Sequence, residues 1–177
     1  DGWYCGYLGW EGRGHYGTRP HLLLQLHVEC ADGSRLAVWT DEGWRGTSGP
    51  ILSSDLYMGE TYDARRELPG WDRPGYDDTV WQAVEVEPRD PAVLLTAQCA
   101  EPVRVVEEIT PRSVTEPMPG TYIVDVGQNL AGYVRLRVQG EAGTRVQLRF
   151  GELLNPDGTL YTENLRTARA TDTYVLK

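Results

Sequence analysis

The stretch Tyr122-Ile-Val-Asp-Val-Gly-Gln-Asn-Leu-Ala-Gly-Tyr-Val-Arg-Leu-Arg-Val138 predicts two β-strands joined at a Gly-Gln-Asn corner. Branched apolar residues precede the corner, and after it Val134, Leu136 and Val138 alternate with two arginines. An alternation of period two places apolar side chains on one face of a strand and polar side chains on the other. The stretch therefore predicts an antiparallel sheet with one face in a core and one face in solvent.

Short strands separated by turn residues are predicted along the rest of the chain as well. Asp32-Gly33 lies between two apolar runs, and this dipeptide is a strong signal of a β-hairpin. Extended runs are predicted at residues 22–28, 36–39, 51–57, 81–86, 93–97, 103–109, 122–126, 133–138, 146–150 and 173–176, with one short helix near residues 163–169. We therefore expect an all-β fold, an antiparallel β-sandwich or jelly roll in two consecutive modules with little helix, divided into residues 1–88 and 89–177.

The charge balance argues against two classes of partner. The chain has 177 residues and a formal net charge of −9, with 17 basic and 26 acidic side chains. The basic residues are scattered, whereas nucleic acids and anionic membranes bind basic patches. No apolar run is long enough to predict a membrane-spanning helix. We therefore expect neither nucleic acid nor a membrane as partner, while the many carboxylates leave Ca²⁺ binding open.

Three cysteines, Cys5, Cys30 and Cys99, are widely spaced along the chain. This pattern predicts neither a disulfide framework nor a zinc site, although a single Cys5–Cys30 bridge stays open. Reduced thiols are typical of the cytoplasm, so we favour a cytoplasmic protein and keep secretion as the alternative. The chain starts without Met at Asp1 and is expected to be part of a longer protein, so a missing targeting signal carries no weight.

The first residues of the chain combine aromatic rings with glycines. Six rings lie among the glycines of this segment, and they are Trp3, Tyr4, Tyr7, Trp10, His15 and Tyr16. Glycine frees the backbone, and flat rings with a polar edge are suited to stack on sugars. Two interpretations stay open: the segment is a sugar-binding loop, or its rings only cover one edge of a sandwich.

Acidic residues gather in a stretch rich in Gly and Pro, namely Asp63, Asp72, Asp77 and Asp78. A catalytic pair of carboxylates has to face across a pocket, and one of the two needs a raised pKa. Nothing in the spacing indicates that arrangement, so we interpret these residues as turn formers, with Ca²⁺ binding as the alternative. The run Asn155-Pro-Asp-Gly158 likewise predicts a turn.

Short motifs extend in a fixed order over nearly the whole chain. In the first half these are Asp1-Gly-Trp-Tyr-Cys-Gly6, Tyr16-Gly-Thr-Arg-Pro20, Thr40-Asp-Glu-Gly-Trp44, Gly49-Pro-Ile51, Gly59-Glu-Thr-Tyr-Asp-Ala-Arg65, Gly70-Trp71 and Asp77-Asp-Thr-Val-Trp81. In the second half they are Asp125-Val-Gly-Gln-Asn129, Gly132, Gly151-Glu152, Asn155-Pro-Asp-Gly158 and Asn164-Leu-Arg-Thr-Ala168. Together these motifs make a chain that resembles the N-terminal β-sandwich region of bacterial α-L-rhamnosidases, glycoside hydrolase family 78.

The resemblance implies a role within a longer enzyme. Residues 1–88 are similar to the later part of the family's N-terminal jelly roll, and residues 89–177 to the next β-sandwich. In the family, that sandwich precedes an (α/α)6 barrel that carries the catalytic carboxylates, and this sequence contains no such barrel. The resemblance therefore implies a non-catalytic part, without catalytic residues of its own, of an inverting bacterial enzyme that hydrolyses terminal α-L-rhamnose from glycosides. Its implied partners are the catalytic barrel and an L-rhamnose-containing glycan or glycoside.

An alternative follows from the same resemblance, because some family members carry a jelly roll that binds L-rhamnose with the help of Ca²⁺ (carbohydrate-binding family 67). For such a module the resemblance implies a carbohydrate site at Trp3, Trp10, Glu11 and His15, and a calcium site at the Asp1 carboxylate and the backbone oxygens near Arg45 and Pro50. Gly2 departs from the pattern, because a polar side chain at this position would add a ligand. A third hypothesis is a purely structural linker domain.

Overall fold

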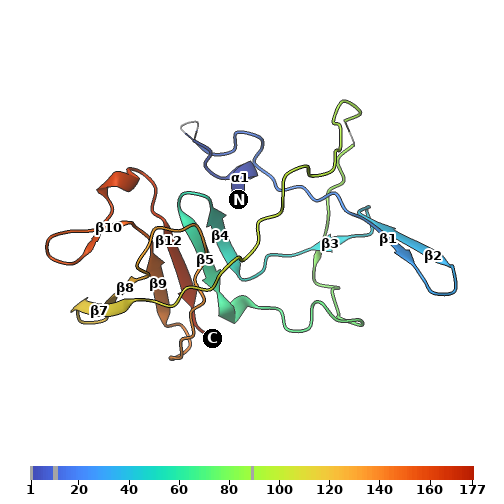
Figure 1. The fold of residues 1–177 in the computed structure, drawn as a ribbon. Helices are drawn as coiled ribbons and strands as arrows, with labels where there is room; N and C mark the ends of the chain where they lie inside the picture. The colour runs from blue at the N-terminus through green and yellow to red at the C-terminus, as the bar shows by residue number, and fades with distance from the viewer. Residues whose placement is uncertain (1, 10–11, 89) are drawn as a thin grey trace.

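The computed structural model describes residues 2–9, 12–88 and 90–177, and its regular structure is nearly all β-strand (Figure 1). The strands of the first half are β1 (Gln25–Glu29), β2 (Arg35–Trp39), β3 (Arg45–Gly46), β4 (Ile51–Asp55), β5 (Gly59–Asp63) and β6 (Gln82–Ala83). Those of the second half are β7 (Ser113–Met118), β8 (Thr121–Asp125), β9 (Arg145–Arg149), β10 (Leu153–Leu154), β11 (Leu160–Tyr161) and β12 (Thr171–Val175). The helices described are α1 (Gly2–Cys5), η1 (Ala64–Arg66) and η2 (Glu163–Leu165), and none of them could cross a membrane. The expected all-β fold with little helix is confirmed.

A four-stranded sheet in the order β4-β5-β12-β9 lies at the centre of the fold (Figure 1). Strand β12 is parallel to β5 and antiparallel to β9, so one pair departs from the otherwise antiparallel pattern. Tyr174 of β12 lies opposite Tyr62 of β5 on one side and opposite Val146 of β9 on the other. The sheet thus joins strands from both sides of the predicted module boundary at residue 88, and that boundary stays a prediction.

The β1–β2 hairpin projects away from this sheet and confirms the prediction made at Asp32-Gly33 (Figure 1). Gly33 has a φ of +82°, a conformation that glycine adopts without steric cost. The Cys30 N–H donates to the Ser34 carbonyl oxygen at 2.9 Å, and the Asp32 carboxylate accepts from the Ser34 N–H at 2.9 Å. Strand β1 begins at Gln25 rather than at residue 22, because β2 ends at Trp39, the partner of Gln25.

Three predicted strands, residues 93–97, 103–109 and 133–138, are not strands in the structure. This prediction is wrong because alternation fixes only which way side chains point, whereas a strand also needs a neighbour that supplies hydrogen bonds. Within the described part of the chain, residues 94–111 and 126–140 form no backbone–backbone hydrogen bond. The strand before the Gly-Gln-Asn corner is confirmed as β8, and its partner is β7.

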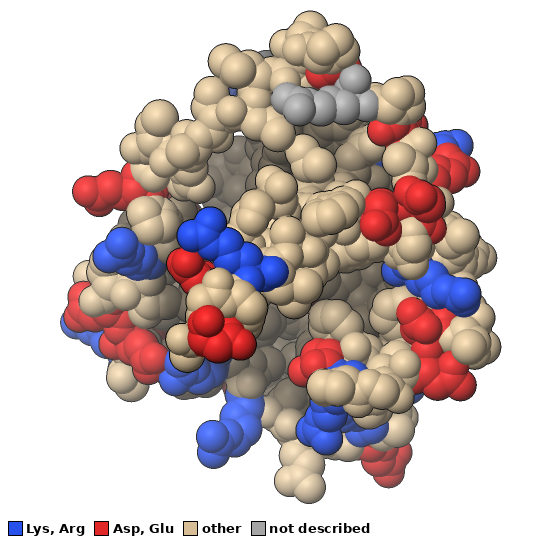
Figure 2. Space-filling view, turned by 90° about the vertical axis from the view of Figure 1, so that its right-hand side faces the viewer, with Lys and Arg blue, Asp and Glu red and all other residues tan. Residues whose placement is uncertain are grey.

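The core is small for a chain of this length. Among the described residues, the buried apolar side chains are Cys5, Ala64, Val175 and Leu176. The chain exposes 15393 Å², whereas a compact monomer of 19.8 kDa exposes about 8,600 Å². Figure 2 shows this openness as deep recesses between chain segments, with acidic and basic side chains interspersed on the same face. The three cysteines are free thiols, and Cys5 is the buried one.

Candidate functional site

The side chain of Asp55, the last residue of β4, links the central sheet to the N-terminal segment, by which we mean residues 2–9 and 12–21. One carboxylate oxygen, Oδ2, accepts a hydrogen bond from the Tyr7 N–H at 2.8 Å. The other, Oδ1, accepts from the N–H groups of Tyr57 at 2.9 Å and Met58 at 3.1 Å. Burial acts to raise the pKa of Asp55, but the three N–H donors outweigh it and hold the pKa below the ordinary value of 3.8. Asp55 is therefore an ionised structural acceptor that closes the turn after β4.

The glycines of the N-terminal segment allow the chain to approach Asp55 and the rings. A Cβ atom at Gly6 would lie 2.6 Å from Asp55 Oδ2, and a Cβ atom at Gly17 would lie 2.6 Å from the Tyr4 ring. Either distance is shorter than a van der Waals contact, so a side chain at these positions would push the segment away. The alternation of rings and glycines in the sequence thus reflects close packing within the segment.

An aromatic cluster lies on this segment and consists of Trp3, Tyr4, His15, Tyr16 and His21. The Trp3 and Tyr16 rings meet edge to face at 5.4 Å, and His15 meets Tyr16 in the same way at 4.6 Å. Trp3 is 57% exposed and Tyr16 is 54% exposed, so the cluster presents apolar ring surface to solvent. Two of the predicted sugar-binding residues, Trp3 and His15, therefore both contact the ring of Tyr16. Trp10 and Glu11 lie outside the described residues.

A recess of about 570 Å³ opens beside Asp55. Side chains that line it include Tyr7, Arg13, Ser53, Asp55, Thr167 and Arg169. The guanidinium carbon of Arg13 lies 5.3 Å from the centre of the Tyr7 ring, a cation–π distance. Guanidinium groups and hydroxyls can hydrogen bond to sugar hydroxyls, whereas the one carboxylate in the lining is held ionised by its three donors. The recess therefore offers binding groups and not the acid of a glycosidase, which needs a raised pKa.

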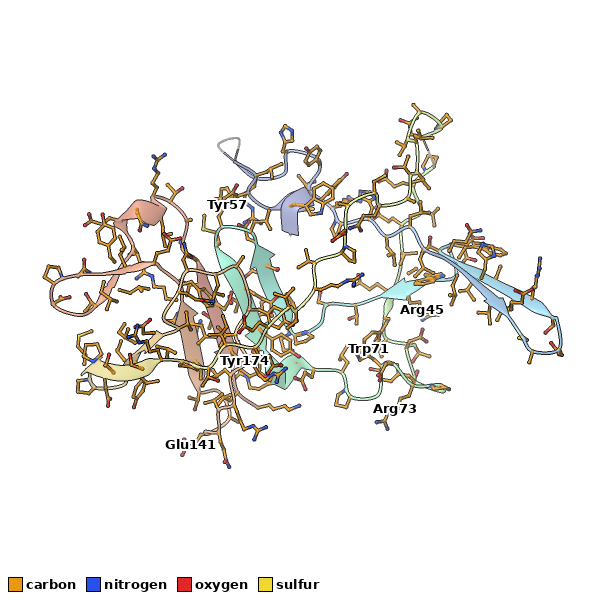
Figure 3. All side chains as sticks on the ribbon, viewed as in Figure 1. Arg45, Tyr57, Trp71, Arg73, Glu141 and Tyr174 are labelled. Atoms are coloured by element: carbon orange, nitrogen blue, oxygen red, sulfur yellow. The ribbon has the colours of Figure 1, made fainter. Side chains whose placement is uncertain are left out.

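Two of the residues predicted to hold calcium through backbone oxygens, Arg45 and Pro50, are described by the structure. Arg45 Nη1 donates to the Thr79 carbonyl oxygen at 3.2 Å, and the Pro50 carbonyl oxygen accepts from the Asp63 N–H at 2.8 Å. Figure 3 shows Arg45 on β3, well away from Tyr57. Asp1 lies outside the described residues. No group of three His, Cys, Asp or Glu residues comes together for a metal ion within residues 2–9, 12–88 and 90–177. A calcium site therefore stays a prediction.

Two of the four acidic residues interpreted as turn formers, Asp63 and Asp77, close turns with their carboxylates. Asp63 accepts from the Arg65 N–H at 3.1 Å and caps η1, and Asp77 accepts from the Thr79 N–H at 3.1 Å. Asp157 accepts from the Thr159 N–H at 3.0 Å. Sequence reasoning did not single out Asp55, although its spacing to the next N–H groups is that of an Asx turn. Its contact with Tyr7 spans 48 positions, and no local signal could have found it.

Two family models match the chain. The model of the α-L-rhamnosidase N-terminal domain matches residues 1–107, and that of the bacterial α-L-rhamnosidase concanavalin-like domain matches residues 115–177. Among whole proteins, an α-L-rhamnosidase of Streptomyces avermitilis is 54% identical over 99% of this chain and 17% of its own length. An α-L-rhamnosidase of Formosa agariphila is 36% identical over 98% of this chain and 19% of its own length. The chain thus spans about a fifth of the length of the relatives it matches.

Solved structures agree with the sequence matches. The structure of the Streptomyces avermitilis α-L-rhamnosidase in complex with L-rhamnose has a TM-score of 0.94 at 55% identity, and covers 99% of this chain and 17% of the solved chain. The native α-L-rhamnosidase of Aspergillus terreus has a TM-score of 0.90 at 38% identity, and covers 99% of this chain and 20% of the solved chain. The chain therefore belongs to the family of α-L-rhamnosidase N-terminal domains.

Proposed function

We propose that this chain is the non-catalytic β-sandwich part of an α-L-rhamnosidase, an enzyme that hydrolyses terminal α-L-rhamnose from glycosides, and that it supports the catalytic barrel of that enzyme. The observation that carries the proposal is the close match of almost the whole chain to a small part of a much longer rhamnosidase, at a TM-score of 0.94. A part that keeps its fold so closely within a longer enzyme serves the architecture of that enzyme.

The chemistry of the recess beside Asp55 is consistent with a supporting role. Hydrolysis of a glycoside with inversion uses two carboxyl groups about 6.5–9.5 Å apart, and one of them has a raised pKa. The recess has Asp55 alone, and the pKa of Asp55 is lowered. We therefore assign the hydrolytic step to the part of the enzyme outside this chain.

A chimera tests this assignment directly. The matching segment of the Streptomyces avermitilis α-L-rhamnosidase is replaced by residues 1–177, and the chimera and the isolated chain are assayed with a chromogenic α-L-rhamnoside. We expect the chimera to hydrolyse the rhamnoside within about tenfold of the parental kcat/KM, a loss of at most about 1.4 kcal/mol. The isolated chain is expected to be inactive. Hydrolysis by the isolated chain would refute its non-catalytic role, and a folded but inactive chimera would refute its supporting role.

The exposed aromatic cluster favours a second candidate function, the binding of L-rhamnose in a glycan. Trp3 and Tyr16 are both more than half exposed, and the Tyr16 ring contacts those of Trp3 and His15 edge to face. Such rings stack on the apolar face of a sugar. Isothermal titration of the chain with L-rhamnose, with and without Ca²⁺ and with L-fucose as control, tests this function. Heat that is selective for L-rhamnose and needs Ca²⁺ would support the calcium-dependent module, and a flat trace from folded protein would refute it.

A further inference from the structure

The recess beside Asp55 lies where three parts of the chain meet. Tyr7 and Arg13 come from the N-terminal segment, Asp55 ends β4, and Thr167 and Arg169 precede β12. The charged residues that line it, within the described part of the chain, are two arginines and one aspartate. Its lining is therefore positive, although the chain as a whole has a formal net charge of −9. Such a local excess of positive charge attracts an anionic ligand.

Arg13 is positioned in the recess by its neighbours. Tyr7 and Arg13 form an antiparallel β-bridge, and the Tyr7 N–H donates to Asp55 Oδ2 at 2.8 Å. The guanidinium carbon of Arg13 lies 5.3 Å from the centre of the Tyr7 ring, which holds the side chain against the same residue. A guanidinium has five N–H donors, so Arg13 can keep its protein partners and still donate to a ligand.

Arg169 is held in the recess by its backbone. The N–H groups of Arg169 and Ala170 both donate to the Tyr57 carbonyl oxygen, at 3.1 Å and 2.9 Å. The Thr171 hydroxyl donates to the Arg169 carbonyl oxygen at 2.7 Å. Ala170 has a φ of +43°, a left-handed conformation that persists in a residue with a side chain only where the surroundings hold it. The guanidinium of Arg169 therefore extends from a fixed base.

The Asp55 carboxylate does not compensate both positive charges. Its two oxygens already accept from the N–H groups of Tyr7, Tyr57 and Met58, and Asp55 is only 9% exposed. Among the ion pairs of the described residues, none joins Asp55 to Arg169. The side chain of Arg169, which is an exposed residue, thus brings a charge that an incoming ligand can meet.

We propose that the recess beside Asp55 binds a sugar that carries an anionic group, and that Arg13 and Arg169 donate to that group. The anionic groups of glycans are the carboxylate of a uronic acid and the sulfate ester, and the planar guanidinium fork binds either with two parallel hydrogen bonds. The hydroxyls of Ser53 and Thr167, which also line the recess, are suited to the sugar hydroxyls.

The size of the recess suits a sugar. Its volume of about 570 Å³ falls within the range of about 300–1,000 Å³ that is typical of small-molecule sites. That the ligand is a sugar rests on the proposed function, which places the chain in an enzyme that acts on glycosides. That the ligand is an anion rests on the two arginines of the recess alone.

Isothermal titration of the chimera with three sugars that differ only at C6 tests the proposal. These are D-galacturonate, D-galactose 6-sulfate and D-galactose. We expect at least one of the two anionic sugars to bind at least about tenfold tighter than D-galactose, because hydrogen bonds between charged groups are the strong ones. The tighter of the two identifies the group as a carboxylate or a sulfate ester. Equal affinities for all three would overturn the proposal, and so would acetate or sulfate that binds as tightly as the sugars.

Activity of the same chimera judges the proposed function separately. A chimera that hydrolyses the rhamnoside but does not distinguish the three sugars contradicts only the anionic-sugar site. A folded chimera that prefers an anionic sugar but is inactive contradicts only the supporting role. The isolated chain is titrated in parallel, and the same preference is expected there because every residue of the site belongs to residues 1–177.

Substitution of Arg169 locates the site. Arg169→Gln is expected to weaken binding of the preferred anionic sugar at least about tenfold, and Arg169→Lys to weaken it less, because lysine keeps the charge but not the planar fork. The matched control is Arg73→Gln, because Arg73 is also exposed and Figure 3 places it well away from Tyr57. Urea midpoints show whether each variant folds. If Arg169→Gln does not fold, Arg13→Gln takes its place with the same expected loss. Unchanged affinity in the folded variant, or an equal loss in Arg73→Gln, would overturn the proposal.

Discussion

The rings of Tyr62 on β5 and Tyr174 on β12 stack at a centroid distance of 5.1 Å with 6° between their planes. The two residues are direct partners in the parallel β5–β12 pair, so the stack lies where the first and second halves of the chain meet. Figure 3 shows Tyr174 within the group of side chains over the central sheet. The Tyr62 hydroxyl donates to Glu67 Oε1 at 3.0 Å, and the other Glu67 oxygen accepts from Lys177. Glu67 therefore links the stacked Tyr62 to Lys177.

The stack is expected to couple Tyr62 and Tyr174 in folding. A double-mutant cycle of Tyr62→Ala and Tyr174→Ala, measured by urea unfolding of the chain, is expected to give a coupling free energy of about 0.5–1.5 kcal/mol. Tyr62→Phe is the matched control, because it keeps the ring and removes only the hydroxyl. A coupling indistinguishable from zero would mean that the stacked geometry contributes nothing beyond the area each ring buries.

Stability is also expected to fall at high pH because of Tyr62. Burial, followed by the hydrogen bond to the Glu67 carboxylate, raises the pKa of Tyr62 from 10.0 to about 12. Between these values the unfolded chain loses the phenol proton while the folded chain retains it, so the free energy of unfolding decreases as pH rises from 10 to 12. Urea midpoints measured across this interval check the slope. In Tyr62→Phe the slope should be shallower, and an unchanged slope would assign it to other groups.

Removing the Asp55 carboxylate is expected to loosen the N-terminal segment. Asp55→Ala leaves the partly buried N–H groups of Tyr7, Tyr57 and Met58 without their acceptor, and we expect a loss near the lower end of the roughly 1–3 kcal/mol that an unsatisfied buried group costs, about 1 kcal/mol. Urea unfolding measures the loss, and amide exchange of Tyr7 locates it. The control is Asp77→Ala, because Asp77 closes a similar but exposed turn at Thr79 and its loss should matter far less. Equal losses in the two variants would contradict a special role for Asp55.

The fold was predictable from sequence wherever the signal is local. Asp32-Gly33 predicts its hairpin because the turn residue and the two strands it joins are neighbours in the chain. The parallel pairing of Tyr62 with Tyr174 was not predictable, since no local pattern selects a partner so far away. Val134 and its neighbours were predicted to face a core, and they line a recess beside β9 and β12, but they form no strand because no described residue supplies the backbone hydrogen bonds that a strand needs.

In the candidate site, too, only the contacts between residues close in the sequence were predictable. Trp3 and His15 come together on Tyr16 because the three residues belong to one short glycine-rich segment, which the sequence shows directly. The contact of Tyr7 with Asp55 joins that segment to β4, and only the folded chain reveals it. Hydrophobic periodicity carries no information about a hydrogen bond between a backbone N–H and a distant carboxylate. The recess beside Asp55 was therefore beyond sequence reasoning.

Adding one carbon at Gly6 is expected to separate the N-terminal segment from β4. In Gly6→Ala the new Cβ would lie 2.3 Å from the Gly2 carbonyl oxygen and 2.6 Å from Asp55 Oδ2, so the first turn of the chain and the carboxylate both have to move. Overpacking of this kind costs about 1–3 kcal/mol, which thermal unfolding would show as a lowered Tm. Gly49→Ala is the control, because no atom lies within 4 Å of a Cβ at Gly49. A Tm that stays unchanged in Gly6→Ala would show that the contacts with Gly2 and Asp55 both yield without cost.

Trp3 is expected to be the residue on which sugar binding depends, if the aromatic cluster is a rhamnose site. Trp3→Ala removes the ring of a residue that is 57% exposed, and should weaken L-rhamnose binding about tenfold, the equivalent of one aromatic stacking interaction. Trp71 is a matched control, because it is 62% exposed and Figure 3 places it well away from Tyr57. Isothermal titration of Trp3→Ala and Trp71→Ala with L-rhamnose gives the two dissociation constants. Equal affinities would exclude the cluster as the binding surface, because removal of the ring would then have had no specific effect.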